Sequence, residues 1–370
     1  MSSGAGGIGA ANSLASILAA TSNLQSQYAT LQQQTTTGLI SQHYAGIASQ
    51  VGQVLDLTAA SAQDTTYTQV ISMNQGRASA MQNALGQISS LTTNMASQAL
   101  QMVGANAGAS VSSVAQQAQQ DLQQLTSLLD TNYSGAYVFS GADTSNPPVP
   151  NPSNITSSGL YTQIGTALAG LGTAPLSTVI ASTVSIAAST AAGTSVFSTY
   201  LNTPAPTTPS AAPGGLGAPG RQIAISSSQT ISLDYPANQN TNAVSDPGIN
   251  GTGSAIKDIL GGLAVLANAT PAMASTADFS ALMQHVATTL TSANQTVNEQ
   301  VGAIGIAQDA MTSATSAQSA SQLVLKQQIN NLTNVDMATA ISNMTAVSSQ
   351  LQTSYQVLSL AKTLNLASFL

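Results

Sequence analysis

The sequence predicts a mainly α-helical fold in which long antiparallel helices from both ends of the chain form a coiled-coil rod, with a β-rich (α+β) outer domain inserted between them. Apolar residues recur at a period near 3.5 at both ends of the 370-residue chain, the spacing of helices wound against other helices. All but one of the prolines fall in the middle of the chain. This pattern divides the chain into an N-terminal helical rod half (1–141), an inserted variable domain (142–253) and a C-terminal helical rod half (254–370).

The N-terminal half is predicted to contain long helices joined by short turns. Its first apolar stripe consists of Leu14, Ile17, Leu24, Tyr28 and Leu31. Gly38 is expected to end this helix, because glycine readily adopts the left-handed conformation found after a helix C-terminus. Helical spacing returns from residue 45 to about 102, a loop is expected at 103–110, and another helix at 111–129.

The inserted domain has a different character. A short β-prone run, 137–139, precedes the proline-rich segment 146–154. Residues 221–235 alternate apolar and polar side chains with a period of two and predict a strand pair. The segment 175–189 fits either a helix or a strand.

Helices return in the C-terminal half. One is expected at 255–267, and a nearly continuous helical stretch from 278 onward is interrupted near 330–334. The last stripe consists of Met337, Ile341, Met344, Leu351, Tyr355 and Leu358, followed by an apolar end with Leu364, Leu366, Phe369 and Leu370. A lone amphipathic helix cannot hide such a stripe, so we expect the two terminal stripes to pack together and to form the assembly surface of the protein.

Charge is scarce. Only 5 % of residues are charged, against about 25 % in a typical globular protein, and the formal net charge is -7. The five basic residues are too scattered to form a phosphate-binding stripe, so nucleic acid binding is not expected. The low charge suggests a protein that works in an acidic exterior, where few of its groups change protonation as the pH falls.

Cysteine is absent, which excludes disulfides, thiolate chemistry and cysteine-based metal sites. No apolar run approaches the ~20 residues that span a bilayer, so no membrane association is expected. The first residues lack the basic and apolar regions of a secretory signal peptide, and export without a cleaved signal is expected.

The sequence predicts no enzyme, cofactor or metal site. It contains no GxSxG, P-loop, CxxC or HExxH motif. Its two histidines, His43 and His285, have no clustered carboxylates beside them that would complete a metal site.

Several stretches resemble the bacterial flagellin superfamily, most closely its hook-filament junction branch (hook-associated protein 3) and next flagellin. LQQQTTTGL (31–39) is similar to the end of the family's first helix, and residues 331–370 resemble its closing helix. YVFSGADT (137–144) resembles the junction branch's passage from rod to outer domain, and residues 221–235 resemble its return path. The chain departs from the family after Gly38, where Leu39-Ile40 replaces the usual basic residue and Asp-Asp pair.

The resemblance implies a structural component of the extracellular bacterial flagellum that joins hook to filament by coiled-coil polymerisation of its terminal helices. The implied partners are further copies of the chain in a helical homo-oligomer, other axial proteins (a hook-associated protein or flagellin) and an export chaperone. The implied export route is the flagellar type III channel. The alternatives are flagellin itself and an unrelated secreted coiled-coil adhesin or translocator.

Overall fold

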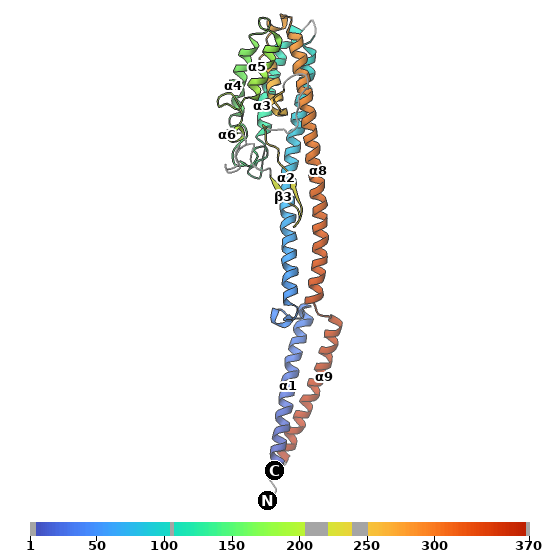
Figure 1. Cartoon of the computed structure of the whole chain (residues 1–370). Helices are drawn as coiled ribbons and strands as arrows, with labels where there is room; N and C mark the ends of the chain where they lie inside the picture. The colour runs from blue at the N-terminus through green and yellow to red at the C-terminus, as the bar shows by residue number, and fades with distance from the viewer. Residues whose placement is uncertain (1–4, 104–106, 204–220, 239–250, 368–370) are drawn as a thin grey trace. The chain divides into compact units, whose positions relative to one another are not determined.

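The computed structural model describes residues 5–103, 107–203, 221–238 and 251–367 (Figure 1). Helix accounts for 73 % of the structure, with two small antiparallel sheets among these residues, which confirms the predicted fold class. The chain divides into a terminal unit, Met1–Thr65 with Ser319–Leu370, and a central unit, Thr66–Gln318. No helix in the described ranges is long and apolar enough to cross a membrane.

The terminal unit contains both ends of the chain. α1 (Ala5–Thr37) lies beside α9 (Met337–Ala367), as Figure 1 shows in blue and red. After α1 comes a short 3-10 helix, η1 (Tyr44–Ile47), and then α2 (Val51–Gln101), which begins in this unit. The last part of α8 (Phe279–Thr333) precedes α9. The predicted break before the closing helix is therefore present.

The central unit contains the rest of α2 and α8 and all the remaining elements. In chain order these are α3 (Ala107–Leu129), β1 (Asn132–Tyr133), β2 (Ala136–Tyr137), η2 (Pro152–Ser157), α4 (Gly159–Leu168), α5 (Leu176–Ala188), α6 (Thr199–Asn202), β3 (Gln222–Ala224), β4 (Thr230–Ser232), α7 (Ala255–Ala267) and η4 (Met273–Ser275).

Apolar side chains at heptad spacing form the core of the central unit. The buried line on α2 runs through Ile71, Ala78, Met81, Leu85, Ile88, Met95, Ala99 and Met102, with Thr92 in the same line. The matching line on α3 contains Leu122, Leu125 and Leu129. Every residue of α7 is buried, and α7 packs against α3, α4 and α5. Several helices thus surround one apolar core.

The segment expected to form the inserted domain contains more helix than strand in its described parts. The ambiguous segment 175–189 contains α5, which buries Val179, Thr183 and Ala187 at a spacing of four residues. Pro175 immediately precedes this helix, a position that tolerates proline because no helical hydrogen bond needs its nitrogen. The expected strand pair is confirmed, since β3 and β4 are antiparallel with Ile223 opposite Ile231.

Two buried cations connect separate elements of the central unit. Arg77 on α2 donates from Nη2 to the carbonyl oxygen of Val138 at 3.0 Å. Burial, reinforced by nearby Arg221, lowers the pKa of Arg77 to about 10. Lys257 on α7 donates from Nζ to the carbonyl oxygen of Ala188, the last residue of α5, also at 3.0 Å. A cation at a helix C-terminus is favourable because it meets the negative end of the helix dipole.

Candidate assembly surface

The pairing of α1 with α9 forms the candidate assembly surface. Gln25 Nε2 donates to Tyr355 Oη at 2.7 Å, and Thr35 Oγ1 contacts Met344 Sδ at 3.8 Å. These two contacts show an antiparallel pairing, since the later residue on α1 meets the earlier residue on α9. The stripes from opposite ends of the sequence therefore belong to one helix pair.

The predicted surface residues do not all face the partner helix. Half-buried side chains are Ile17, Leu24, Tyr28 and Leu31 on α1 and Met344 and Leu358 on α9, while Leu351 is buried. Met337, Ile341 and Tyr355 are 40 %, 48 % and 47 % exposed. The side chains of Leu14, Leu364 and Leu366, and all of Phe369 and Leu370, lie outside the described residues.

The line of α9 that contacts α1 includes two residues outside the predicted stripe. Ala340 is 2 % exposed and Val347 is 9 % exposed, and both alternate with Met344 and Leu351 at heptad spacing. The sequence contains the pattern that predicts both residues, because counting alanine as apolar extends the heptad line from 344 and 351 back to 340 and 347. Ile341 and Tyr355 lie beside this inner line, and Met337 is its exposed first position at the start of α9. We call these three exposed side chains the outer stripe.

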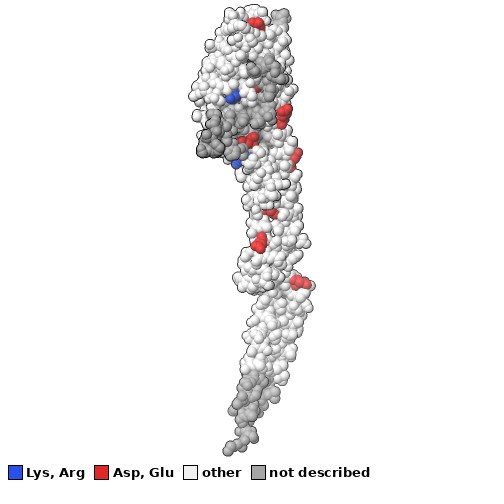
Figure 2. Space-filling view, viewed as in Figure 1, with Lys and Arg blue, Asp and Glu red and all other residues white. Residues whose placement is uncertain are grey.

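Charge is nearly absent from the helix pair. Across the 33 residues of α1 and the 31 residues of α9, Lys362 is the one charged residue in the sequence. On the face seen in Figure 2 the charged side chains of the chain are few and stand singly. Packing and hydrogen bonds between uncharged groups therefore hold the pair together.

A backbone joint ties the two halves of the chain together where α1 ends and α9 begins. Ile40 donates its N–H to the carbonyl oxygen of Thr333 at 2.8 Å, and Val335 donates to that of Gly38 at 2.9 Å. Leu39 and Asn334 form an isolated antiparallel bridge between these bonds. Gly38 has a φ of 74°, a left-handed conformation that glycine adopts without strain. This confirms the predicted end of the first helix.

Asp336 caps the start of α9. Its Oδ1 accepts the N–H of Ala338 at 3.0 Å, and its Oδ2 accepts the Thr339 hydroxyl at 2.7 Å. These hydrogen bonds, the one from Thr339 first, lower the pKa of Asp336 because they favour the ionised carboxylate. The joint and the cap together fix the point from which α9 starts.

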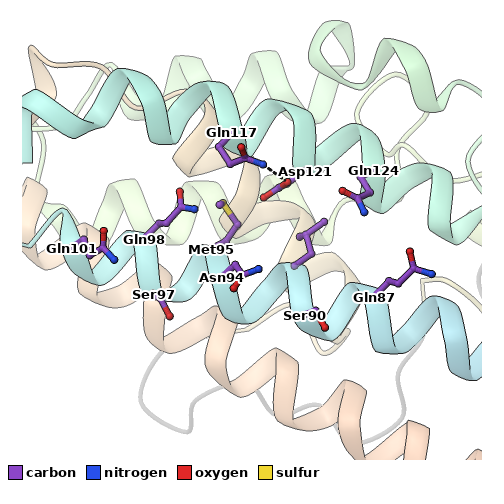
Figure 3. Close-up of a pocket in the computed structure, with 11 residues that line it drawn as sticks. Gln87, Ser90, Asn94, Met95, Ser97, Gln98, Gln101, Gln117, Asp121 and Gln124 are labelled. Carbon is purple, nitrogen blue, oxygen red and sulfur yellow. Dashed lines mark hydrogen bonds between the residues drawn. The ribbon is translucent and has the colours of Figure 1, made fainter.

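A second surface feature is a groove of roughly 640 Å³ in the central unit, between α2 and α3. Figure 3 shows amide and hydroxyl side chains from both helices along it, with Gln117 directed toward Asp121. The bond from Gln117 Nε2 to Asp121 Oδ1 measures 2.8 Å. Asp121 is the one ionisable residue among the described residues that line this groove.

The two histidines belong to different units of the structure. His43 is exposed in the terminal unit, and His285 is half-buried in the central unit. In the described part of the chain, no group of three or more His, Asp or Glu residues could hold a metal ion.

Comparison with known families accounts for both helical halves. Residues 6–144 match the bacterial flagellin N-terminal helical region, and residues 287–370 match the bacterial flagellin C-terminal helical region. Together these matches cover more than half of the chain. The chain belongs to the bacterial flagellin superfamily. The matched regions contain α1, α9 and the joint between them.

Membership of the flagellin superfamily makes this chain a structural component of the extracellular bacterial flagellum, and the family is not an enzymatic one. An unrelated adhesin or translocator therefore no longer fits. A solved structure named as a candidate flagellar hook-associated protein of Vibrio parahaemolyticus has 12 % sequence identity and a TM-score of 0.49. The alignment covers 76 % of this chain and 96 % of that one. No curated protein matches the chain.

Proposed function

We propose that this chain joins the hook to the flagellar filament, and that it polymerises through the α1–α9 pair. The observation that carries the proposal is the outer stripe, Met337, Ile341 and Tyr355, which stays 40–48 % exposed after α1 and α9 have packed together. Leu18 on α1 and Leu360 on α9 are exposed as well. A two-helix pair without charged contacts is incomplete by itself, since a helix with apolar residues on more than one side needs more than one neighbour.

The proposed mechanism is the burial of the outer stripe against neighbouring subunits. Covering the exposed half of these three side chains would stabilise each contact by about 2–4 kcal/mol. A head-to-tail contact of this kind generates helical arrays instead of closed dimers. The partners would be further copies of this chain and the adjoining hook-associated protein or flagellin. Before assembly, an export chaperone would cover the same helices, and the chain would pass unfolded through the type III channel.

The choice of the junction role over flagellin is supported by the sequence passages around the inserted segment. The run 137–141 leads out of the β1–β2 hairpin, and the β3–β4 hairpin leads back toward α7. Both resemble the junction branch more than they resemble flagellin. Flagellin, the filament subunit itself, remains the alternative, because the Val-Asp-Met-Ala run at 335–338 and the Leu-rich end of the sequence favour it somewhat.

Electron microscopy of cells that carry a tagged copy of the chain tests the role. We expect label confined to the joint between hook and filament. Label along the whole filament would identify the chain as flagellin instead, and label absent from the flagellum would contradict both roles.

Substitution of Ile341 tests the surface. We expect Ile341→Gln to leave the helix pair folded, because the side chain is half exposed, and to weaken polymerisation as measured by sedimentation. Ser342→Gln, an exposed position on the same helix, is the matched control and should polymerise normally. Equal polymerisation of the two variants would contradict the outer stripe as a contact.

Truncation tests the end of the closing helix. Removal of residues 364–370 is expected to give an exported, soluble chain that does not assemble. Motility of cells that carry only the truncated chain would refute this role for the apolar end.

A further inference from the structure

Uncharged side chains link α2 and α8 along the central unit. In the central unit four hydrogen bonds between two side chains join the helices, and we call these four the neutral ladder. The pairs, with their distances, are Gln75–Thr312 at 3.2 Å, Ser79–Gln308 at 3.1 Å, Ser89–Asn298 at 2.9 Å and Thr93–Asn294 at 2.9 Å. In most coiled coils the positions that flank the apolar line hold Glu and Lys, which form salt bridges across the pair. Here amides and hydroxyls make these contacts.

The neutral ladder has one register. Each step of four residues along α2, from 75 to 79 and from 89 to 93, is matched by an equal step backward along α8. Because none of these groups ionises, neither protonation nor salt screening alters the four bonds. The terminal unit has similar bonds of its own, from Gln322 Nε2 to Thr65 Oγ1 at 3.4 Å and from Gln25 Nε2 to Tyr355 Oη.

Ionisable groups of the central unit lie on the ladder helices and on the elements that pack against them. On α2 and α8 they are Tyr67, Arg77, His285, Glu299 and Asp309, the last two being exposed. On the surrounding elements they are Asp121, Asp130, Tyr133, Tyr137, Asp143, Tyr161, Tyr200, Arg221, Asp234, Tyr235, Lys257, Asp258 and Asp278. Within the ladder itself, every bond joins two uncharged side chains.

We propose that the central unit is built to stay folded in acid, because hydrogen bonds between uncharged side chains hold its long helices together and the carboxyl groups of Asp121, Asp130 and Asp234 lie buried or half-buried in it. The proposal concerns folding of the chain and does not depend on the junction role. It implies that the protein works in an acidic surrounding medium.

Folding raises the pKa values of three carboxyl groups, which is the direction that stabilises the folded chain in acid. Burial raises the pKa of Asp130 to about 6, although its Oδ1 accepts the N–H of Val149 at 2.8 Å. Burial likewise raises the pKa of Asp121, although the hydrogen bond from Gln117 acts to lower it. It also raises the pKa of Asp234, although nearby Arg77 and Arg221 act to lower it. In each case the neutral acid fits its surroundings better than the carboxylate does.

The sign of the pH dependence follows by linkage. A carboxyl whose pKa is raised by folding binds more protons in the folded state than in the unfolded state. The folded state therefore gains stability as the pH falls through the folded-state value, about 6 for Asp130, down to the unfolded value of about 4. Histidine is the side chain type that ordinarily gains charge as the pH falls below neutral, and His285 is the histidine in the described part of the central unit. A His285→Gln variant separates its contribution.

The experiment is urea unfolding of the full chain from pH 7 to about pH 4, followed by helix content. We expect the midpoint at about pH 4 to equal or exceed that at pH 7. For Asp130 alone, allowing for partial solvent screening, the unfolding constant should fall about tenfold. A midpoint that drops between pH 7 and about pH 4, in both the native chain and His285→Gln, would overturn the proposal.

Variants complete the test. Asp121→Asn, Asp130→Asn and Asp234→Asn combined keep the shape of the neutral acids and should remove the rise in stability. If the combined variant does not fold, Asp130→Asn alone should reduce it. If the combined variant, or Asp130→Asn alone where the combined variant does not fold, still shows the full rise in stability at low pH, these carboxyl groups are not its cause.

Replacing one bond of the neutral ladder with an ion pair tests whether the absence of charge matters. The double variant Ser79→Glu, Gln308→Lys replaces one neutral bond with an ion pair. Its midpoint should depend on salt between about 0.01 and 0.15 M, where the Debye length falls from about 30 to about 8 Å, whereas the native chain should not respond. A native chain that responds as strongly as the variant would contradict the proposal.

Discussion

The central unit and the terminal helix pair use the same heptad spacing but bury it to different depths. On α2, Met81, Leu85, Ile88 and Met95 are fully buried. On α9, Met344 and Leu358 at equivalent spacing are only half-buried. The difference lies in the number of neighbours, since the core of the central unit is shared by α2, α3, α7 and α8, whereas α9 packs mainly against α1. Equal periodicity therefore accompanies a complete core in one case and an unfinished one in the other.

The largest expected effect compares two leucines. Leu85→Ala should lower the free energy of unfolding by about 2–5 kcal/mol, because it opens a cavity in a closed core. Leu24→Ala, at a half-buried position on α1, should cost less than about 1.5 kcal/mol in the unassembled chain. Chemical denaturation measures both. Equal costs would mean that the terminal pair is already as complete as the central core.

A glycine in the central unit should show how closely its backbone packs. A Cβ at Gly159 would meet the carbonyl oxygen of Gly193, which as backbone cannot turn aside. Gly159→Ala should therefore destabilise the unit by about 1–3 kcal/mol in the same denaturation measurement. A neutral effect would show that the start of α4 shifts freely.

Gly86 has open space where a Cβ would lie, so its substitution should raise stability, in contrast to that of Gly159. Gly86 lies in the middle of α2, and a Cβ there would meet nothing within 4 Å. Gly86→Ala should raise the free energy of unfolding by about 0.5–1 kcal/mol, because alanine loses less backbone entropy in a helix. A lower midpoint would reveal a contact at this position in the folded chain.

The smallest expected effect is confined to the start of α9. Asp336→Ala should speed amide hydrogen exchange at residues 338–340, whereas Asp336→Asn should retain protection because asparagine also caps helices. The lowered pKa of Asp336 means that its contribution is present above the unfolded-state value and is lost as the pH falls through the folded-state value. Strong acid should thus loosen this cap, in contrast to the central unit. Identical exchange in the two variants would show that the side chain does not cap α9.

Much of the fold could be predicted because local signals agreed with tertiary packing. The helix expected at 255–267 is found at those bounds, since Ser254 caps it and its apolar residues enter the core. Residues 175–189 could not be assigned, because Ser, Thr, Val and Ile there fit either structure and the neighbours decided. Burial of Val179, Thr183 and Ala187 selects the helix.

The assembly surface was predictable only in part. Met344, Leu351 and Leu358 belong to two possible heptad lines, one through 340 and 347 and one through 341 and 355. The line through 341 and 355 has the larger side chains and is the one that the apolar pattern predicts, whereas α1 packs on the line containing Ala340, where a small side chain lets the helices approach. The choice depends on the partner helix, which a single stripe does not encode.

Burial of Arg77 and Lys257 has a consequence for survival outside the cell. Proteases of the trypsin type cut after lysine or arginine in chain that they can pull into an extended form. The sequence has five such residues, and two of them are buried and hydrogen-bonded between elements of the central unit. A third, Lys326, lies within α8. The scarcity of charge that makes the helix contacts neutral thus also leaves digestive enzymes few places to begin on the folded chain.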